Sequence, residues 1–348
     1  MSAAGDYLTL SRLPVAIVTS VCFVLGGLAA PHHPLAALVV LGLAGILQQA
    51  FACHINDIAD YEADRRNPGR RPSPLVTGAV TLPRITFWAV TESVILTCAA
   101  VAAVRPWPAL AGFVIVIMMT AWVNSFQKTS RFVSPLVTDV IFGLAIALPL
   151  PLSAWALSGH LAPVPLWLGA AWMFQMVMMN TTTGNLKDLE HDRASGARTT
   201  ALVLGVRQVA GRFVLTRRYL AFVLAAQGAS VACLAAACAI AARSAVQQAL
   251  AAAALLIALA STAGLARQLR PASQRPRGPA ARSRLTGLPA TWGHDAGPVL
   301  GNLVAFLLAA AASISASGVG WFALVIGGWT ALVFAIRALR AVTPGRLA

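Results

Sequence analysis

Stretches of about 20 apolar residues, the length that crosses the hydrocarbon core of a bilayer as a helix, recur along nearly the whole of this 348-residue chain. Hydrophobic residues make up 58% of the sequence and charged residues 11%, whereas a soluble domain carries about 25% charged residues. So little charge excludes a water-soluble globule, and so many apolar residues exclude a disordered chain. The sequence predicts an all-α polytopic membrane protein with ten spans, or nine if one weakly separated C-terminal pair is a single span. The expected spans, the first of them retained rather than cleaved, lie near residues 13–30, 35–56, 85–104, 107–126, 135–157, 164–185, 218–241, 245–265, 297–316 and 320–338.

Basic residues are distributed unevenly over the loops between these spans. Lys and Arg number 26 against 11 acidic residues, which gives a formal net charge of +15. With the N-terminus inside, 24 of the 26 basic residues fall on the cytoplasmic side. This bias follows the positive-inside rule, so we expect contact with membrane lipids and no nucleic-acid partner. The whole chain, 1–348, is predicted to form one multi-pass domain in the inner or plasma membrane, with both termini and the loops 57–84, 127–134, 186–218 and 266–296 in the cytoplasm.

Seven of the 11 acidic residues lie in two short windows, 56–64 and 187–192, each at the inner end of an expected span. Within each window the aspartates recur every three or four residues, which puts their carboxylates on one face of a helix. Like charges stacked in this way repel one another, and a helix C-terminus disfavours negative charge. Hard divalent cations remove that repulsion, and Mg²⁺ in particular shares its ligands between carboxylates and substrate phosphates. The two windows therefore predict a site for Mg²⁺ and a phosphorylated substrate.

Together the two windows resemble the paired motifs of the UbiA superfamily of intramembrane prenyltransferases. The first reads N-D-x-x-D-x-x-x-D from Asn56 to Asp64, and the second reads D-x-x-x-D from Asp188 to Asp192 within the sequence NLKDLEHDRASGART. The resemblance covers at least the first six to eight expected spans. It implies a helical fold, usually of nine transmembrane spans around a central cavity, with both motifs at the cytoplasmic ends of even-numbered spans.

The resemblance also implies roles for individual residues, carried over position by position. Two Mg²⁺ ions with the diphosphate would be bound by Asn56, Asp60, Asp64, Asp188 and Asp192. Catalytic roles would fall to Asp60, Asp64, Asp188, Asp192 and Lys128, and contacts to the diphosphate to Asn56, Asp57, Arg71, Lys128, Lys187 and Arg198.

At two places the chain departs from the family's pattern. The segment 67–78 is looser than the family's R-P-L-x-S-G, so Arg70 is an alternative to Arg71 for the diphosphate contact. Asn124, four residues before Lys128, stands where the family often has Tyr, so no role in orienting the acceptor is carried over to it.

Two further carboxylates fall inside expected spans, where an ionisable residue is a functional candidate by default. Asp139 lies about one turn below the cytoplasmic face and is a candidate to line the cavity and handle a proton. Glu92 lies in the third expected span. His54, two residues before the first motif, is interpreted as a packed neighbour.

The sequence and the resemblance together predict a Mg²⁺-dependent enzyme. It would transfer a prenyl group from an allylic prenyl diphosphate to a lipophilic, aromatic acceptor in the membrane, by ionisation to a carbocation. A UbiA-type terpene cyclase, which acts on a prenyl diphosphate alone, is the alternative on the same scaffold. A transporter or Mg²⁺ channel is a third hypothesis, but transporters bind at the bilayer midplane on broken helices, whereas both acidic windows here lie at one face.

Overall fold

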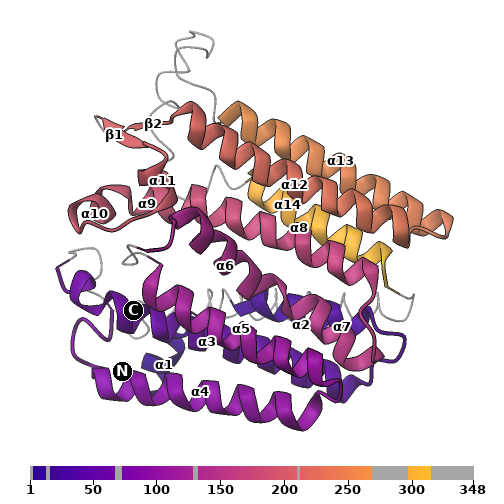
Figure 1. Ribbon diagram of the computed structural model, residues 1–348, viewed down its shortest axis with the longest axis horizontal. Helices are drawn as coiled ribbons and strands as arrows, with labels where there is room; N and C mark the ends of the chain where they lie inside the picture. The colour runs from indigo at the N-terminus through magenta and orange to yellow at the C-terminus, as the bar shows by residue number, and fades with distance from the viewer. Residues whose placement is uncertain are drawn as a thin grey trace, which may run out of the picture. The chain divides into compact units, whose positions relative to one another are not determined.

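The computed structural model describes residues 3–12, 16–66, 73–127, 132–209, 212–268 and 297–314, and in these ranges the chain is mostly helical (Figure 1). Helices suit a membrane chain because their backbone polar groups bond within their own segment. The elements are α1 (Ala3–Leu10), α2 (Ala16–Leu28), α3 (Leu35–Asp64), α4 (Leu82–Ala103), α5 (Trp107–Phe126), α6 (Pro135–Ala147), α7 (Pro149–Ser158), α8 (Pro163–Met179), the π-helical turn η3 (Asn180–Gly184), α9 (Asn185–Lys187), α10 (Leu189–Ala194), α11 (Thr200–Val203), β1 (Arg207–Val209), β2 (Arg212–Val214), α12 (Arg217–Ala241), α13 (Ala245–Gln268) and α14 (Gly297–Ala312).

The predicted spans agree with these helices. The first nine expected spans each coincide with a described helix or pair of helices, and the tenth, 320–338, lies outside the described residues. The all-α membrane fold is therefore confirmed. Among the described residues, six helical segments are long and apolar enough to cross a membrane: Leu35–Asp64, Leu82–Ala103, Trp107–Phe126, Pro135–Ser158, Arg217–Ala241 and Ala245–Arg267.

The described chain divides into two compact units. The first contains the described residues of Met1–Phe126 and Leu144–Gly169, and the second contains those of Gln127–Gly143 and Ala170–Ser313. The boundaries fall within α6 and α8. The prediction of a single domain over 1–348 stays a prediction.

In the first unit, α2 packs closely against α3 and α7 through two glycines. A Cβ atom added to Gly26 would lie 2.0 Å from the backbone oxygen of Leu150, and one added to Gly45 would lie 2.4 Å from the Cα atom of Ser20. Small residues that let two backbones approach are a common basis of helix association in membranes, where water supplies no hydrophobic driving force between helices.

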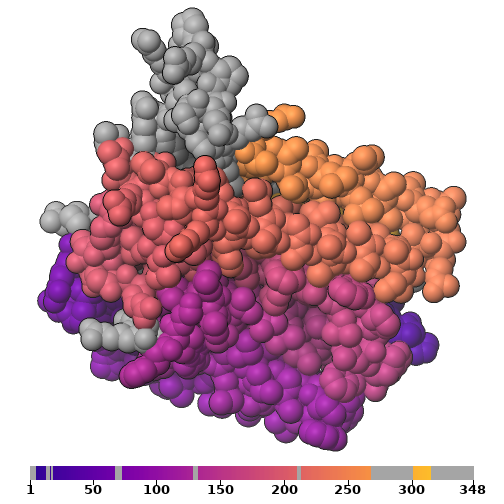
Figure 2. All heavy atoms as spheres, turned by 45° about the horizontal axis from the view of Figure 1, so that its top comes forward, coloured from indigo at the N-terminus to yellow at the C-terminus, as the bar shows by residue number. Residues whose placement is uncertain are grey.

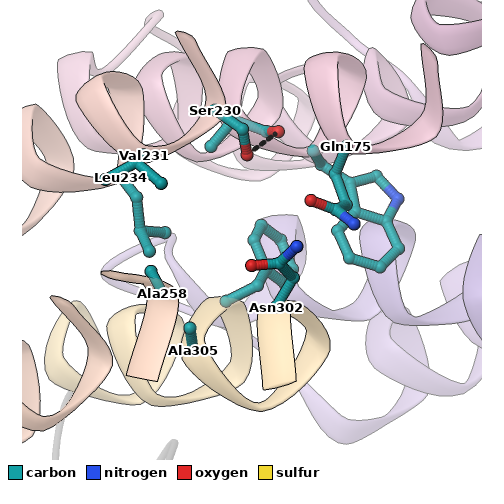
Figure 3. A pocket seen from close by; sticks show the side chains of 10 residues that line it. Gln175, Ser230, Val231, Leu234, Ala258, Asn302 and Ala305 are labelled. Carbon is teal, nitrogen blue, oxygen red and sulfur yellow. Dashed lines mark hydrogen bonds between the residues drawn. The ribbon is translucent and has the colours of Figure 1, made fainter. Parts of the chain in front are cut away.

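In the second unit, α12, α13 and α14 lie side by side (Figure 1) and are joined by a buried polar cluster. The amide nitrogen of Gln227 donates to the hydroxyl of Thr262 at 2.9 Å and to the side-chain oxygen of Asn302 at 3.0 Å, and its oxygen accepts from the Asn302 amide at 2.9 Å. A small pocket beside this cluster is lined by ten residues of α8, α12, α13 and α14, among them Gln175, Ser230 and Asn302 (Figure 3).

The outer faces of the long helices are apolar. On α13, which forms part of the surface in Figure 2, Val246 is 70% exposed and Leu256 is 68% exposed, and Phe87 on α4 is 67% exposed. Large apolar side chains on the surface are costly in water but suit contact with lipid chains. This exposure agrees with the membrane fold.

The predicted loops contain more regular structure than expected. α3 continues through the whole first acidic motif to Asp64, and the predicted loop 186–218 contains α10, α11 and a short antiparallel hairpin in which Arg207 pairs with Val214. These short elements bury Leu186, Leu189 and Ala201 in one apolar cluster with Tyr219 of α12. Such brief segments lack the periodicity by which longer helices and strands are predicted, because their burial depends on distant residues.

We expect Gly45→Ala to lower the stability of the protein, whereas Gly42→Ala on the same helix should be tolerated. A methyl group at 45 would collide with the backbone of α2, and such overpacking costs about 1–3 kcal/mol. A methyl group at 42 would meet Val24 Cγ2 at 3.5 Å, an ordinary contact. Thermal unfolding of the two variants in one detergent measures the difference, and equal melting temperatures would contradict the close approach of α2 and α3.

Candidate functional site

The first acidic motif lies on the last turns of α3. Asp57 is buried, at 7% exposure, whereas Asn56, Asp60 and Asp64 are partly exposed. Asp60 and Asp64 are one helical turn apart on the same face, as predicted. Glu62 points elsewhere and forms a surface pair with Arg65 at 3.6 Å. The motif therefore presents an amide and two carboxylates at the end of an apolar helix.

Arg12 is a neighbour of this motif that the sequence reasoning did not single out. Its guanidinium donates a hydrogen bond to the carboxylate of Asp57 and forms an ion pair with it. Burial is the largest influence and lowers the pKa of Arg12, but the charge and hydrogen bond of Asp57 together with the charges of Cys53 and Asp64 outweigh it, so the pKa is raised and the side chain stays cationic. Arg12 has a φ of 47°, a left-handed conformation that is costly for a residue with a side chain. The sequence contained one signal for this neighbour, since Arg12 directly precedes the first expected apolar span.

A buried polar network lies beneath the first motif and joins α1, α3 and α4. The hydroxyl of Tyr7 donates to Glu92 Oε1 at 2.6 Å, and His54 Nδ1 lies 3.0 Å from Glu92 Oε2. The second ring nitrogen of His54 lies 3.3 Å from the hydroxyl oxygen of Ser11. His54 is 0% exposed and Glu92 is 3% exposed. Burial, and then the hydrogen bond and charge of Glu92, raise the pKa of Tyr7, so its hydroxyl keeps its proton.

This network explains the burial of Glu92 and His54, whose roles could not be decided from the sequence. Glu92 accepts from Tyr7 and pairs with His54, so its place in a membrane span is explained by the docking of α1 onto α3 and α4. The interpretation of His54 as a packed neighbour agrees with its complete burial. Together with the ion pair at Asp57, the network fixes the C-terminal end of α3, where the first motif lies.

The second acidic motif follows a break in the helix. Asp188 stands between α9 and α10 with φ −103° and ψ 9°, and the N–H of Asp192 donates to the carbonyl of Asp188 at 2.8 Å. The two aspartates are thus one helical turn apart, but at the start of a short helix rather than at the end of a long one. The argument that a helix C-terminus penalises these charges therefore applies to the first motif and was wrong for the second. Asp192 is 2% exposed, and Lys187 lies 3.8 Å from Asp188.

The residues that precede the second motif form the π-helical turn η3, with the sequence NTTTG. Its three threonines each donate a side-chain hydrogen bond to the carbonyl four residues earlier, in Val177, Met178 and Met179 respectively. Such bonds satisfy carbonyl oxygens where the regular α-helical pattern is interrupted. Asp139 accepts from the side chain of Asn180 in this turn, and its other carboxylate oxygen lies 3.0 Å from the hydroxyl oxygen of Thr181. π-turns are often found at functional sites, and sequence reasoning missed this one.

The remaining predicted residues are distributed as follows. Arg71, its alternative Arg70, and Lys128 lie outside the described residues. Arg198 is partly buried. In the described ranges, no group of three His, Cys, Asp or Glu side chains is close enough to hold a metal ion. The two motifs belong to different units, so their joint metal site stays a prediction.

Comparison with known proteins identifies the family. The UbiA prenyltransferase family matches residues 15–243, more than half of the chain. The chain therefore belongs to the UbiA prenyltransferase family, as its two motifs predicted.

Two relatives illustrate the degree of similarity. The chain is 26% identical over 194 residues to the 4-hydroxybenzoate octaprenyltransferase of Paracidovorax citrulli, a match that covers 53% of this chain and 59% of the relative. It is 27% identical over 185 residues to the enzyme of the same name from Ralstonia nicotianae, and this match covers 53% of this chain and 60% of the relative. The chain thus spans about three fifths of the length of these relatives.

Solved structures support the fold. A digeranylgeranylglyceryl phosphate synthase structure gives a TM-score of 0.65 at 15% identity and covers 90% of this chain and 99% of its own. A UbiA homologue from Aeropyrum pernix K1 gives 0.58 at 21% identity, covering 87% and 96%. A UbiA homologue from Archaeoglobus fulgidus bound to Cd²⁺ gives 0.53 at 17% identity, covering 87% and 99%. At these identities the likeness shows the shared all-α membrane fold.

We expect Tyr7→Phe to destabilise the protein while Tyr61→Phe does not. The first change leaves Glu92 Oε1 buried without its hydroxyl donor, at a cost of about 1–3 kcal/mol. Tyr61 lies partly exposed, with its ring beneath the guanidinium of Arg65. Thermal unfolding in detergent compares them, and an unchanged melting temperature for Tyr7→Phe would show that the network does not hold α1.

Proposed function

We propose that this protein transfers a prenyl group from an allylic prenyl diphosphate to a lipophilic, aromatic acceptor in the membrane. The observation that carries the proposal is the pair of acidic motifs, one at the end of the apolar helix α3 and the other at the start of the short helix α10, in a chain that belongs to the UbiA prenyltransferase family. An aromatic acceptor is supported by relatives that are named for 4-hydroxybenzoate.

The donor atoms of the motifs fit a hard divalent cation. Asp60 and Asp64, with Asn56 one turn before them, present only oxygen donors for a metal at the end of α3, and Asp188 and Asp192 do the same in the second motif. We propose that these five residues hold Mg²⁺, two ions with the diphosphate. A divalent cation bound there would neutralise the negative charge that develops on the departing diphosphate. One UbiA homologue of this fold binds Cd²⁺.

The chain's own cations complete the proposed diphosphate site. Lys187, 3.8 Å from Asp188, and Arg198 flank the second motif, and Arg71 and Lys128 are proposed to approach from the loops 57–84 and 127–134. Positive side chains preorganised around a departing anion stabilise charge that appears only in the transition state. The apolar helices exclude water, which protects an allylic cation until the acceptor attacks it.

Asp57 has a different part in this proposal. Its carboxylate is already paired with Arg12, so it orients the end of α3 and reaches the diphosphate only together with that arginine. The site is proposed to face the cytoplasm, with the N-terminus on the same side, because 24 of the 26 basic residues fall there when the spans are threaded in this way.

The test of the function is incubation of the purified protein with Mg²⁺ and prenyl diphosphates of several lengths, with and without 4-hydroxybenzoate and other phenolic acids, followed by mass spectrometry. We expect a prenylated aromatic product that requires both substrates. A cyclised hydrocarbon formed from the diphosphate alone would instead identify a terpene cyclase.

Neutral variants of the motifs should abolish turnover. Asp60→Asn and Asp188→Asn should each lower kcat/KM more than about 100-fold, because a lost metal ligand costs several kcal/mol of transition-state stabilisation and each 1.36 kcal/mol is one decade. Matched controls are Glu62→Gln and Glu190→Gln, whose carboxylates form surface pairs with Arg65 and Arg193 and should matter little. Equal losses in variants and controls would reject the assignment.

Lys128→Ala should lower kcat/KM by roughly 10- to 150-fold. A charge-assisted hydrogen bond to the diphosphate is worth about 1.5–3 kcal/mol. Lys128→Arg should be only partly active, because the planar guanidinium group of arginine replaces the compact ammonium group of lysine. If Lys128 only anchors its loop to anionic lipid, Arg will substitute freely and Ala will cost little in the same steady-state assay.

A further inference from the structure

Asp139 is a buried carboxylate that contacts the turn before the second motif. α6 approaches α8 closely at Gly143, where an added Cβ would lie 2.7 Å from the carbonyl oxygen of Met173. Asp139 lies one turn earlier on the same face of α6 and is 1% exposed. Its Oδ1 accepts from the amide of Asn180 at 2.8 Å, and its Oδ2 accepts from the hydroxyl of Thr181 at 3.0 Å.

A third donor reaches the same carboxylate from another direction. The amide of Gln127, the residue before Lys128, donates to Asp139 Oδ1 at 3.4 Å. Among the described residues, no Lys, Arg or His forms an ion pair with Asp139. A buried carboxylate held only by uncharged donors is costly in a membrane span, so it needs a reason to be there.

The π-turn η3 explains why a carboxylate is buried at this place. In η3 the N–H of Asn185 bonds to the carbonyl of Asn180, five residues back, which inserts one residue relative to a regular α-helix. One residue corresponds to about 100° of rotation around a helix axis. The residues after the turn, among them Asp188 and Asp192, therefore lie about 100° around the helix axis from the positions that an uninterrupted α-helix would give them. An isolated π-turn is rare, and contacts from outside the helix must support it.

Two further contacts hold this turn. The hydroxyl of Tyr219 donates to the carbonyl of Thr181 at 3.1 Å. A Cβ at Gly184 would lie 2.7 Å from Asn180 Oδ1, so the glycine leaves the space in which the Asn180 side chain reaches Asp139. Gly184 has ordinary helical backbone angles, so a glycine is not needed here for conformational freedom. It is needed because a side chain would occupy the space of the Asn180 side chain.

We propose that Asp139 is a positioning residue: it holds the π-turn Asn180–Gly184 in register, and so sets the direction in which Asp188 and Asp192 point. Through Gln127 the same carboxylate anchors the start of the loop 127–134, which carries Lys128. As a statement about catalysis the proposal rests on the proposed function, but as a statement about the turn it does not.

The hydrogen-bond pattern around Asp139 shows how a positioning role of this side chain can be distinguished from a direct role of its negative charge. The hydroxyl of Thr181 lies within bonding distance of both Asp139 Oδ2 and the carbonyl of Val177, but it has one hydrogen to donate. An asparagine at 139 would still accept from Asn180 through its oxygen and would donate its own N–H to Thr181, which then donates to Val177. Asp139→Asn therefore keeps the contacts with Asn180 and Thr181, whereas Asp139→Leu has nearly the same size and keeps neither.

The experiment compares four variants of the full-length protein in one detergent: Asp139→Asn, Asp139→Leu, Gly184→Ala, and the control Gly228→Ala, whose methyl group would have no atom within 4 Å. Two quantities are measured for each variant. The first is the pair KM and kcat for a prenyl diphosphate, and the second is amide hydrogen exchange of residues 180–200. Gly184→Ala perturbs the turn by crowding the Asn180 side chain and removes no polar group, so the result does not depend on whether Asp139→Leu folds.

We expect Asp139→Leu and Gly184→Ala to exchange faster at 180–200 and to lose about 100-fold in kcat/KM, the scale expected for catalytic groups displaced by about 1 Å. Asp139→Asn and Gly228→Ala should stay within about threefold of the parent protein. If Asp139→Asn loses as much activity as Asp139→Leu, the charge acts directly and the proposal is overturned. Unchanged exchange in Gly184→Ala and in folded Asp139→Leu would also overturn it. If the parent protein turns over no prenyl diphosphate, the proposed function fails, and exchange alone still decides the role of Asp139.

Discussion

The absence of water from the bilayer interior is the constraint on which the rest of this structure depends. A buried polar group that finds no partner in the protein has none at all, so each polar side chain in a span must be matched by another. In the part of the chain that the structure describes, three buried clusters supply such partners: Tyr7, His54 and Glu92 in the first unit, and in the second Gln227 with Asn302 and Asp139 with η3. Apolar contacts between helices alone are less specific, because lipid chains offer similar contacts.

Two of these clusters lie next to the acidic motifs. The ion pair of Arg12 with Asp57 and the bonds of Glu92 hold the end of α3, and Asp139 holds the turn before Asp188. In each case a carboxylate that we do not assign to metal supports neighbouring carboxylates that we do. A motif that holds several negative charges near one another needs such support, because in the absence of a cation the charges repel one another within it.

The sequence predicted the membrane class, nine of the described helical spans and the family, because each depends on local features: apolar length, basic-residue bias and the spacing of aspartates. It did not predict Arg12 as the partner of Asp57, since those residues are 45 positions apart and only the folded chain brings them together. It suggested that Asp139 lines the cavity and handles a proton, which stays a prediction, and it did not predict the donors in the π-turn that surround this carboxylate. The π-turn was missed because its signal, three threonines and a glycine, has no helical periodicity.

The extra residue in η3 constrains how this part of the chain can change over evolutionary time. Loss of one residue from the turn would let the chain return to a regular α-helix with the second motif in the same place, whereas gain of another residue would rotate the motif by about 100° around the helix axis. The segment 180–188 should therefore tolerate the loss of one residue better than the gain of one, although it looks like an ordinary polar connection.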